Sequence, residues 1–244
     1  MKAEIKKHID LMLEHKVIEP SVSPWASPVV LARKKNGDWR FCVDLRIVNS
    51  LTKKDTYPLP RIDETLDTLG TKKAKVFSTL DLASGYWHIP VAEEHKERSA
   101  FTTGDGLYQF CKMPFGFTGA PGCFCRALNH SLGDSIGDIC LAYVDDIIIF
   151  SDSVEAHFRD LITIFEKLAA KRFNLKLSKC FFFQREVEFL GFQVTEGGMK
   201  MSPSKLKAIN DFEAPRNKGE LMRFLGMVVW YRRFIKDLAV VSQR

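Results

Sequence analysis

The sequence predicts an α+β fold built around antiparallel sheet, and two observations support this. First, extended runs are joined by tight turns at Asn36-Gly37, over 104–106 and within 139–151, as in β-hairpins. Second, the helical patterns are scattered irregularly among these hairpins. A doubly wound parallel sheet needs strands and helices in regular alternation, so that class is not predicted.

The first half of the chain combines one clear helix with strands and Pro-rich connections. Ile5, Ile9, Met12 and Leu13 recur at helical spacing near the N-terminus, whereas prolines force the following segment to be extended or looped. The predicted elements are a helix over 3–16, an extended segment over 19–28, a hairpin over 28–46, a short helix ending at Gly70, a strand over 75–82, an extended continuation over 86–92 and a hairpin over 99–114.

The second half is predicted to be richer in helix. Ser202-Pro203 and Asn217-x-x-Glu220 are both helix-start signals, an N-cap before proline and a capping-box pattern. The predicted elements are a helix over 121–133, a strand–turn–strand over 139–151, a helix over 154–172, two short strands within 180–198 and two C-terminal helices. The apolar face of the 154–172 helix is predicted to comprise Phe158, Leu161, Ile162, Phe165 and Leu168.

Composition sets broad limits on the class of protein. With 244 residues and 45% hydrophobic content, the chain can bury a sizeable core in one or two domains. It has no run of about 18 apolar residues and no secretory signal, so no membrane association is expected. The six cysteines show no metal-binding spacing, and we expect them to be reduced, mostly buried thiols of an intracellular protein.

Charge is distributed unevenly along the chain. Residues 1–75 carry 15 Lys/Arg and 10 Asp/Glu, residues 76–200 carry 12 and 16, and residues 201–244 carry 9 and 4. The net charges are therefore +5, −4 and +5. Positive flanks around a negative centre suit a polyanion held at two ends with metal ions between, although ordinary surface variation is an alternative.

Two adjacent aspartates, Asp145 and Asp146, interrupt the apolar run AYVDDIIIF. A surface hairpin with a Val-Asp-Asp turn is one explanation, because Asp is a favoured turn residue. Another is a carboxylate cluster, since Asp81 ends the 75–82 strand and strand ends can meet hairpin turns at one sheet edge. Clustered carboxylates need cations, and Mg²⁺ prefers such oxygen ligands. Two Mg²⁺ ions about 4 Å apart would serve phosphoryl transfer.

Seven stretches then form an ordered series over about residues 20–236. They are SPWASPVVLARKKNGDWRFCVDLRIVN, KKDTYPLPRIDETLDTL, STLDLASGYWHIPVAEEHKERSAFTT, KMPFGFTGAPGCFCRALN, AYVDDIIIFS, NLKLSKCFFF and VEFLGFQVTEGG. The series resembles the reverse transcriptases of retroviruses and LTR retrotransposons, in particular those of gypsy-type (Metaviridae-like) elements. The resemblance implies a right-hand polymerase: a palm with an antiparallel sheet, fingers and a partial thumb.

The resemblance also implies how the chain is divided. The parts are the first part of the fingers over 1–76, the first part of the palm over 77–112, a fingers/palm helix over 113–135, the rest of the palm over 136–200 and an incomplete thumb over 201–244. Relatives of this kind are parts of larger polyproteins, and we expect the same here. No ribonuclease H signature is present, so no ribonuclease H activity is expected from this chain.

In the family pattern, Asp81, Asp145 and Asp146 correspond to the catalytic, metal-binding aspartates, which use two Mg²⁺ ions with Mn²⁺ as an alternative. Lys179, in the stretch LSKC, resembles the lysine proposed to protonate the leaving pyrophosphate. Such a role requires a proton donor near the β-phosphate.

Tyr86 resembles the aromatic gate that lies under the deoxyribose and excludes a 2′-hydroxyl. Without the family pattern, a packed strand aromatic is the alternative. Phe115 and Gly116 occupy the place beside the nucleotide where retroviral relatives carry Gln-Gly. A phenylalanine side chain excludes polar contacts at that point.

Arg40 resembles the fingers arginine that contacts the incoming triphosphate, and Lys34 and Lys35 both fit the lysine that accompanies it. A guanidinium binds phosphate oxygens bidentately, whereas an ammonium acts as a point charge. A solvated basic hairpin tip is the alternative for this segment.

Phe189, Leu190 and Gly191 resemble the primer grip. The implied reaction is attack by a primer 3′-hydroxyl on the α-phosphate of a deoxynucleoside triphosphate, on an RNA or DNA template with a DNA or tRNA primer. The alternative from another class is a domesticated or inactive nucleic-acid-binding module. The three aspartates and the aromatic gate are intact, so the sequence shows no sign of such decay.

Overall fold

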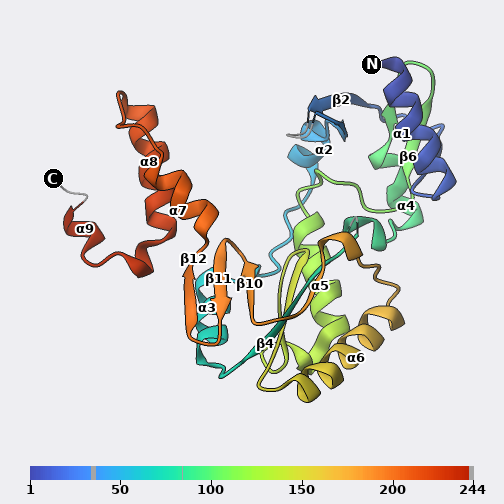
Figure 1. Cartoon of the computed structure of the whole chain (residues 1–244). Coiled ribbons are helices and arrows are strands. Elements are labelled where there is room, and N and C mark those ends of the chain that lie inside the picture. The colour runs from blue at the N-terminus through green and yellow to red at the C-terminus, as the bar shows by residue number, and fades with distance from the viewer. Residues whose placement is uncertain (34–36, 84, 242–244) are drawn as a thin grey trace.

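Three β-sheets organise the part of the chain that the computed structural model describes, residues 1–33, 37–83 and 85–241. Their strand orders are β1-β6-β5-β2-β3, β7-β8-β4-β9 and β10-β11-β12. Nearly all strand pairs are antiparallel, and the β2–β5 pair is parallel. Figure 1 shows the five-stranded sheet at one end, the four-stranded sheet in the centre and a pair of long helices on the other side. The predicted α+β class is confirmed.

The five-stranded sheet is closed on one face by the N-terminal helix. Ile9 and Met12 of α1 (Lys2–Glu14) are buried against Phe101 and Phe110. Both predicted hairpins of this region are present as β2–β3 and β5–β6. The elements are β1 (Ile18–Pro20), β2 (Ser27–Arg33), β3 (Trp39–Val43), α2 (Arg46–Leu51), α4 (Glu93–Lys96), β5 (Phe101–Thr102) and β6 (Leu107–Phe110).

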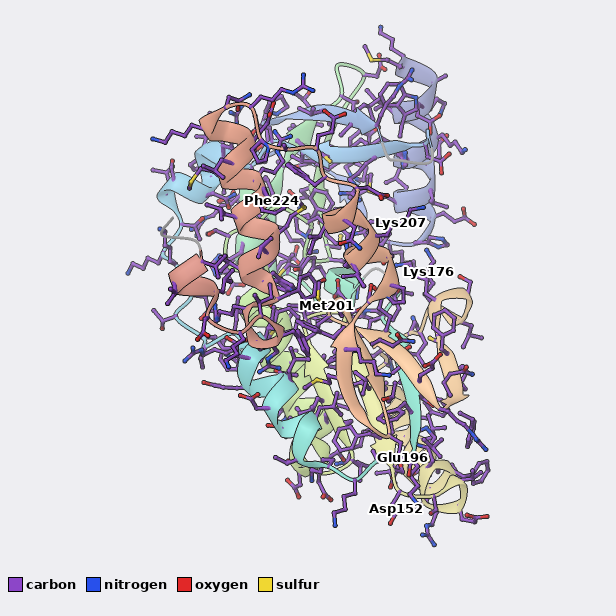
Figure 2. The ribbon with its side chains drawn as sticks, turned by 60° about the vertical axis from the view of Figure 1, so that its left-hand side comes forward. Asp152, Lys176, Glu196, Met201, Lys207 and Phe224 are labelled. Carbon is purple, nitrogen blue, oxygen red and sulfur yellow. The ribbon has the colours of Figure 1, made fainter. Side chains whose placement is uncertain are left out.

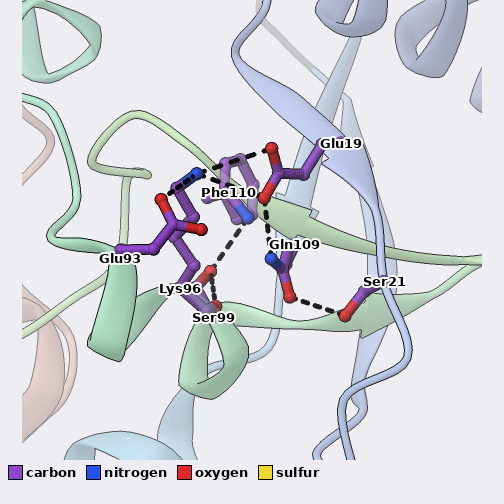
Figure 3. Close-up of polar contacts among 7 residues, drawn as sticks. All are labelled: Glu19, Ser21, Glu93, Lys96, Ser99, Gln109 and Phe110. Atoms are coloured by element: carbon purple, nitrogen blue, oxygen red, sulfur yellow. Dashed lines mark hydrogen bonds and ion pairs between the residues drawn. The ribbon is translucent and has the colours of Figure 1, made fainter.

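A polar network ties β1 to β6 and to α4 (Figure 3). The Glu19 carboxylate accepts hydrogen bonds from Gln109 Nε2 at 2.8 Å and from Lys96 Nζ at 3.2 Å. Ser21 Oγ donates to Gln109 Oε1, and the hydroxyl of Ser99 accepts the backbone N–H of Phe110. Hydrogen bonds from Gln109, Cys111 and Lys96 lower the pKa of Glu19. The short strand β1 is thus held by side chains as well as by its ladder.

Strands β4 and β8, in the middle of the four-stranded sheet, are buried on both faces. Leu80, Ile147 and Ile149 pack against α5 (Ala120–Leu132) and α6 (Val154–Ala170), whereas Phe77 and Ile148 contact α3 and the β10–β12 sheet. This explains why the sequence of β8 reads as a continuous apolar run rather than an alternating one. The strands are β4 (Val76–Asp81), β7 (Cys140–Tyr143), β8 (Asp146–Ser151) and β9 (Phe181–Gln184).

The C-terminal region leads from a small sheet into two helices that stand clear of the centre (Figure 1). Met201 marks the passage from β12 to α7, with Lys207 and Phe224 on the helices beyond it (Figure 2). The Asn217 side chain caps α8 by accepting the N–H of Glu220 at 2.9 Å, as the sequence predicts. The C-terminal elements are β10 (Glu186–Phe189), β11 (Phe192–Thr195), β12 (Gly198–Met201), α7 (Pro203–Asn210), α8 (Lys218–Trp230) and α9 (Leu238–Val241). The helix α3 (Ile62–Thr71), from the first half of the chain, packs beside them.

Two sequence predictions about local structure are wrong, and two short helices were missed. Residues 86–92 do not simply continue the strand, because a 3-10 helix, η1 (Gly85–His88), turns the chain there. The 180–198 segment contains three complete strands, β9, β10 and β11, and the first residue of β12, where only two strands were predicted. The four-residue helix α4 and the six-residue helix α2 were not predicted, since such short helices leave little periodicity to detect.

Burial also differs from expectation at α6 and at the cysteines. The buried residues of α6 are His157, Leu161, Ile164 and Leu168, so the core-facing stripe is rotated from the predicted one. Phe158, Ile162 and Phe165 are exposed. Of the six cysteines, all free thiols, only Cys125 and Cys140 are fully buried. Among the described helices, none has both the length and the apolar character to span a bilayer.

Candidate active site

The register of the central sheet brings the predicted aspartates to one edge. Strands β4 and β8 are antiparallel, and Asp81 at the end of β4 lies opposite Asp146 at the start of β8. Asp145 precedes Asp146 in the connection from β7, and its carbonyl accepts the N–H of Leu82 at 3.3 Å. Carboxylates that are 64 residues apart in sequence are therefore neighbours in the fold.

The connection that carries Asp145 is tight and strained. Because Tyr143 pairs with Asp146, only Val144 and Asp145 lie between the strands. Val144 has φ of +52°, a conformation that a β-branched residue rarely adopts. Positive φ suits a two-residue hairpin connection, and the buried strands on either side hold the turn in place. The rigid sheet thus fixes where Asp145 points.

One carboxylate oxygen of this site is buried and unsatisfied. Asp145 Oδ1 has no hydrogen-bond partner, although nearly all buried polar atoms in folded proteins have one. Gly85 leaves the space for it, since a Cβ atom on Gly85 would collide with this oxygen and crowd the Phe124 ring. A buried anionic oxygen without a hydrogen-bond donor would be satisfied by binding a cation.

Mutual repulsion adds to burial in setting the acidity of the cluster. Burial, followed by the charges of Asp146 and Asp81, raises the pKa of Asp145, and burial and Asp81 raise the pKa of Asp146. Lys179 opposes both effects. Its Nζ lies 2.8 Å from Asp81 Oδ2, and this hydrogen bond raises the pKa of Lys179. The site therefore places an ammonium against one of its three carboxylates.

The three carboxylates are neighbours along an edge rather than ligands gathered around one point. Within residues 1–33, 37–83 and 85–241, no three His, Cys, Asp or Glu side chains are grouped closely enough to hold a metal ion as they stand. The donors nevertheless fit a divalent cation such as Mg²⁺ or Mn²⁺. They are hard oxygen atoms, and one of them is buried without a partner. Burial and the charge of neighbouring carboxylates raise the pKa of Asp145 and Asp146, an effect that a bound cation would offset.

Tyr86 lies beside the aspartates. Burial and the charge of Asp145 raise the pKa of its phenol, which places the ring within the electrostatic reach of the carboxylate. The ring makes edge contacts with Phe115, at a centroid distance of 4.9 Å, and with Phe124, at 5.5 Å. Phe115 is itself 51% exposed. The partly buried Tyr86 and the exposed Phe115 thus form an aromatic pair beside the carboxylates.

The loop after Phe115 is held by a residue that the sequence did not single out. Gly116 has φ of +97°, and its carbonyl accepts a hydrogen bond from Asn49 Nδ2 at 2.7 Å. The Asn49 Oδ1 atom accepts the N–H of Thr118 at 2.9 Å. Asn49 of α2 therefore fixes both sides of this loop. No pattern in the sequence indicates that Asn49 has this role.

Of the three predicted triphosphate contacts, the described part of the chain includes only Arg40. Arg40 is exposed on β3, opposite Ala32 in the hairpin, and among the contacts of the described residues none joins it to an aspartate. Lys34 and Lys35 lie outside the described residues. The assignment of these three side chains stays a prediction.

The predicted primer grip lies close to the hairpin that carries Asp145. Phe189 ends β10 and is buried, while Leu190 and Gly191, with φ of +52° and +81°, form the connection to β11. A cavity of about 700 Å³ is lined by Leu190, Gly191, Tyr143 and residues of α7 and α8. The Tyr231 hydroxyl donates to the Gly191 carbonyl at 3.1 Å. Sequence reasoning missed this tyrosine because only the fold brings it to the turn.

Comparisons with known proteins show the family of the chain. The family model described as "Reverse transcriptase (RNA-dependent DNA polymerase)" matches residues 32–194. The chain is 40% identical over its full length to the retrovirus-related Pol polyprotein from transposon opus of Drosophila melanogaster. It is 39% identical over 98% of its length to that from transposon gypsy. It spans 24% of each of these relatives.

A viral relative and solved structures extend the likeness. The enzymatic polyprotein of cauliflower mosaic virus is 34% identical over 98% of the chain, which covers 36% of that protein. A foamy viral protease-reverse transcriptase in complex with double-stranded DNA matches with a TM-score of 0.91 and 27% identity, covering 99% of this chain and 42% of that one. The α+β polymerase architecture and the gypsy-type resemblance are both confirmed. The chain belongs to the reverse transcriptase (RNA-dependent DNA polymerase) family.

Proposed function

We propose that the chain is an RNA-directed DNA polymerase that adds deoxynucleotides to a primer 3′-hydroxyl on an RNA or DNA template. The observation that carries the proposal is the carboxylate edge, where Asp81 and Asp146 oppose each other and Asp145 Oδ1 is buried without a partner. A nucleotide-binding surface and a primer-binding turn belong beside such an edge. In support, Tyr86 is close enough to Asp145 for that charge to raise its pKa, and Leu190 lines a cavity together with Tyr143 of β7.

Reverse transcriptases generally use divalent metal ions. Asp81, Asp145 and Asp146 would hold two Mg²⁺ ions, or Mn²⁺, which would stabilise the charge that develops on the attacking and leaving oxygens. Asp81 would then exchange the Lys179 ammonium for a cation. Lys179, released from Asp81, would face the leaving pyrophosphate as proton donor or counter-charge, because a lysine is ordinarily protonated at neutral pH.

Nucleotide selection would be shared between two regions. The Tyr86 ring, backed by Phe124 and flanked by Phe115, would contact the deoxyribose and exclude a 2′-hydroxyl. Arg40, which is exposed on β3, would contact the triphosphate together with Lys34 or Lys35. The chain's own contribution is positioning and charge stabilisation rather than covalent chemistry.

Nucleic acid would lie between the two basic ends of the chain. The similar foamy viral proteins were solved with double-stranded DNA and with an RNA/DNA hybrid, which supports nucleic acid as the partner. In this proposal residues 1–76 are fingers, 77–112 and 136–200 are palm, 113–135 join the two, and 201–244 are thumb. Lys and Arg of the ends would neutralise phosphates, so affinity should fall steeply with salt.

The test is primer extension on matched RNA and DNA templates with Mg²⁺ or Mn²⁺. We expect the wild-type chain to extend the primer and Asp145→Asn to lose at least about 10²-fold in rate, because it removes a charge the transition state needs. Asp152→Asn is the matched control, since Asp152 is an exposed aspartate at the opposite end of β8 (Figure 2).

Two results would overturn the proposal. One is extension by Asp145→Asn at the wild-type rate. The other is tight, salt-dependent primer–template binding without extension under either metal ion, which would identify a nucleic-acid-binding module instead.

A further inference from the structure

A histidine that the proposed mechanism does not use holds the turn that carries Tyr86. His88 closes the 3-10 helix Gly85–His88, and its Nδ1 lies 2.9 Å from the Gly85 carbonyl oxygen. On the other side of the ring, Nε2 lies 2.9 Å from the backbone nitrogen of Asn174. The ring rests on Phe173 at a centroid distance of 5.1 Å.

These two partners fix the protonation state that the arrangement requires. The Gly85 carbonyl can only accept, so Nδ1 must carry the proton. The Asn174 N–H can only donate, so Nε2 must be unprotonated. The contacts therefore demand a neutral imidazole in the Nδ1–H form. A doubly protonated ring would leave the Asn174 N–H without an acceptor and place two N–H groups against each other.

The surroundings favour the neutral form. Burial lowers the pKa of His88, the Gly85 carbonyl opposes this, and the charge of Lys112 lowers the pKa further. Lys112 is the charged group that acts on the ring; Phe173, Asn174 and Gly85 carry no charge. Since an ordinary histidine has a pKa near 6.5, protonation of His88 needs a pH below about that value.

His88 completes a series of backbone contacts that begins at Asp81. Lys176 N–H donates to the Asp81 carbonyl at 2.8 Å, and Ala83 N–H donates to the Asn174 carbonyl at 2.9 Å. The bond from Asn174 to His88 extends this pairing to the turn. The 3-10 helix Gly85–His88 places Gly85 against the Asp145 carboxylate and Tyr86 against Phe124.

We infer that neutral His88 is a positioning residue for Tyr86, and that discrimination between deoxyribonucleotides and ribonucleotides therefore depends on the protonation of His88. The inference rests on the proposed role of Tyr86 as the sugar gate. His88 itself touches no substrate. It acts by holding both ends of the turn that presents the ring, so its loss should affect which sugar is accepted more than the rate with the correct nucleotide.

The experiment measures the ratio of kcat/KM for a deoxynucleotide to that for the matching ribonucleotide, in primer extension at pH 8.0 and pH 5.5. In the wild type we expect the ratio to fall about 3- to 10-fold at the lower pH, the effect of losing one hydrogen bond. His88→Gln should show no such fall, because its amide can donate to Gly85 and accept from Asn174 yet does not titrate. His88→Ala should show the low ratio at both pH values. His15→Gln, at an exposed histidine just after α1, is the matched control and should follow the wild type.

A second readout does not depend on polymerase activity. Nitrogen-15 NMR of the histidine side chains should show one ring, absent from His88→Gln, in the neutral Nδ1–H form at pH 7.5. If the ring that is absent from His88→Gln is instead in the Nε2–H form, the inference is overturned.

The outcomes separate the inference from the proposed function. If Tyr86→Val admits ribonucleotides but the ratio for the wild type is the same at both pH values, the inference fails and the function stands. If Tyr86→Val leaves discrimination unchanged, the gate itself fails, and the inference fails with it. If no primer is extended at all, the proposed function fails.

Discussion

The central sheet and the α7–α8 helix pair differ sharply in how deeply their side chains are buried. In β8, Ile147, Ile148 and Ile149 are completely buried, and the strand is covered on both faces. In α7 no residue is buried, and in α8 only Val228 is. Apolar side chains such as Met222 and Trp230 stay exposed on the helices. The strand that carries Asp146 lies in the core of the protein. The helices proposed to follow the primer–template are mostly exposed and are joined to the rest of the protein at their base.

The attachment of the helix pair is correspondingly small. Tyr231, just after α8, packs on Phe192 and donates to the Gly191 carbonyl. Arg232 and Arg233 each form an ion pair with an aspartate of α3, both at 2.6 Å. Carboxylates that must hold cations need a fixed frame, because small displacements are costly in catalysis. Helices that follow a polymer can be positioned by a few contacts at their base.

Core truncation should give the largest difference between the two regions. Ile148→Ala leaves a cavity in the middle of β8 and should lower the free energy of unfolding by about 2–5 kcal/mol. Met222→Ala, on a side chain that is 62% exposed in α8, should change it by no more than about 0.5 kcal/mol. Urea unfolding followed by circular dichroism measures both. Equal losses of unfolding free energy would show that side chains of the helix pair contribute as much to the core as those of the sheet.

The next prediction concerns a buried polar chain behind the sheet. His157 of α6 is fully buried between two serines: Nε2 lies 2.7 Å from Ser78 Oγ on β4, and Nδ1 lies 2.8 Å from Ser151 Oγ on β8. Ser151 Oγ donates to Asp160 Oδ2 at 2.6 Å, so it must accept from an Nδ1–H. The network thereby joins both carboxylate-bearing strands to α6 through a neutral imidazole.

This arrangement makes stability depend on pH. Burial lowers the pKa of His157 in the folded state, with Asp160 opposing, so the unfolded state binds a proton first as pH falls. The contribution of His157 is complete above about pH 6.5 and decreases as pH falls below that value. Unfolding in urea at pH 7.5 and 5.5 should show a loss of stability in the wild type. The loss should be smaller in His157→Asn, a variant that cannot titrate and that we expect to be less stable at both pH values. An equal loss in both would exclude His157 as the cause.

The sequence was most informative where a local pattern has a local cause. The pairing of β2 with β3, the Asn217 cap and the strand formed by the apolar run of β8 all depend on neighbouring residues, and each is present as predicted. The 3-10 turn after β4 was missed because it depends on His88 contacting Asn174, 86 residues away in the sequence. The buried face of α6 was misjudged because periodicity gives the presence of an apolar face but not which side meets the sheet.

The same distinction applies to the candidate site. Asp81, Asp145 and Asp146 could be named from sequence because carboxylates in apolar surroundings need an explanation. The supporting residues could not, since Gly85, Asn49 and Tyr231 act through space. Gly85 is needed only because the Asp145 carboxylate passes close to its backbone, and nothing near Gly85 in the sequence indicates that.

A smaller effect is expected where the helix pair meets the β10–β11 turn. Tyr231→Phe removes only the hydroxyl that bonds to the Gly191 carbonyl and keeps the packing on Phe192. We expect a loss of about 0.5–1.5 kcal/mol in the free energy of unfolding, typical of one hydrogen bond. If the turn binds the primer, KM for primer–template should rise while kcat changes little. A fall in kcat alone would place Tyr231 in the chemistry rather than in attachment.

The smallest effects should come from the two ion pairs at the base of the helices. The Arg232 side chain is 60% exposed and that of Arg233 is 23% exposed, so water and salt screen the first pair more strongly. Each substitution by glutamine should cost no more than about 1 kcal/mol, with Arg233→Gln the larger. Raising sodium chloride from 0.05 to 1 M should reduce the Arg232→Gln effect more completely. If neither effect responds to salt, the arginines act through the packing of their aliphatic stems on α3, and the helix pair is held by contact rather than by charge.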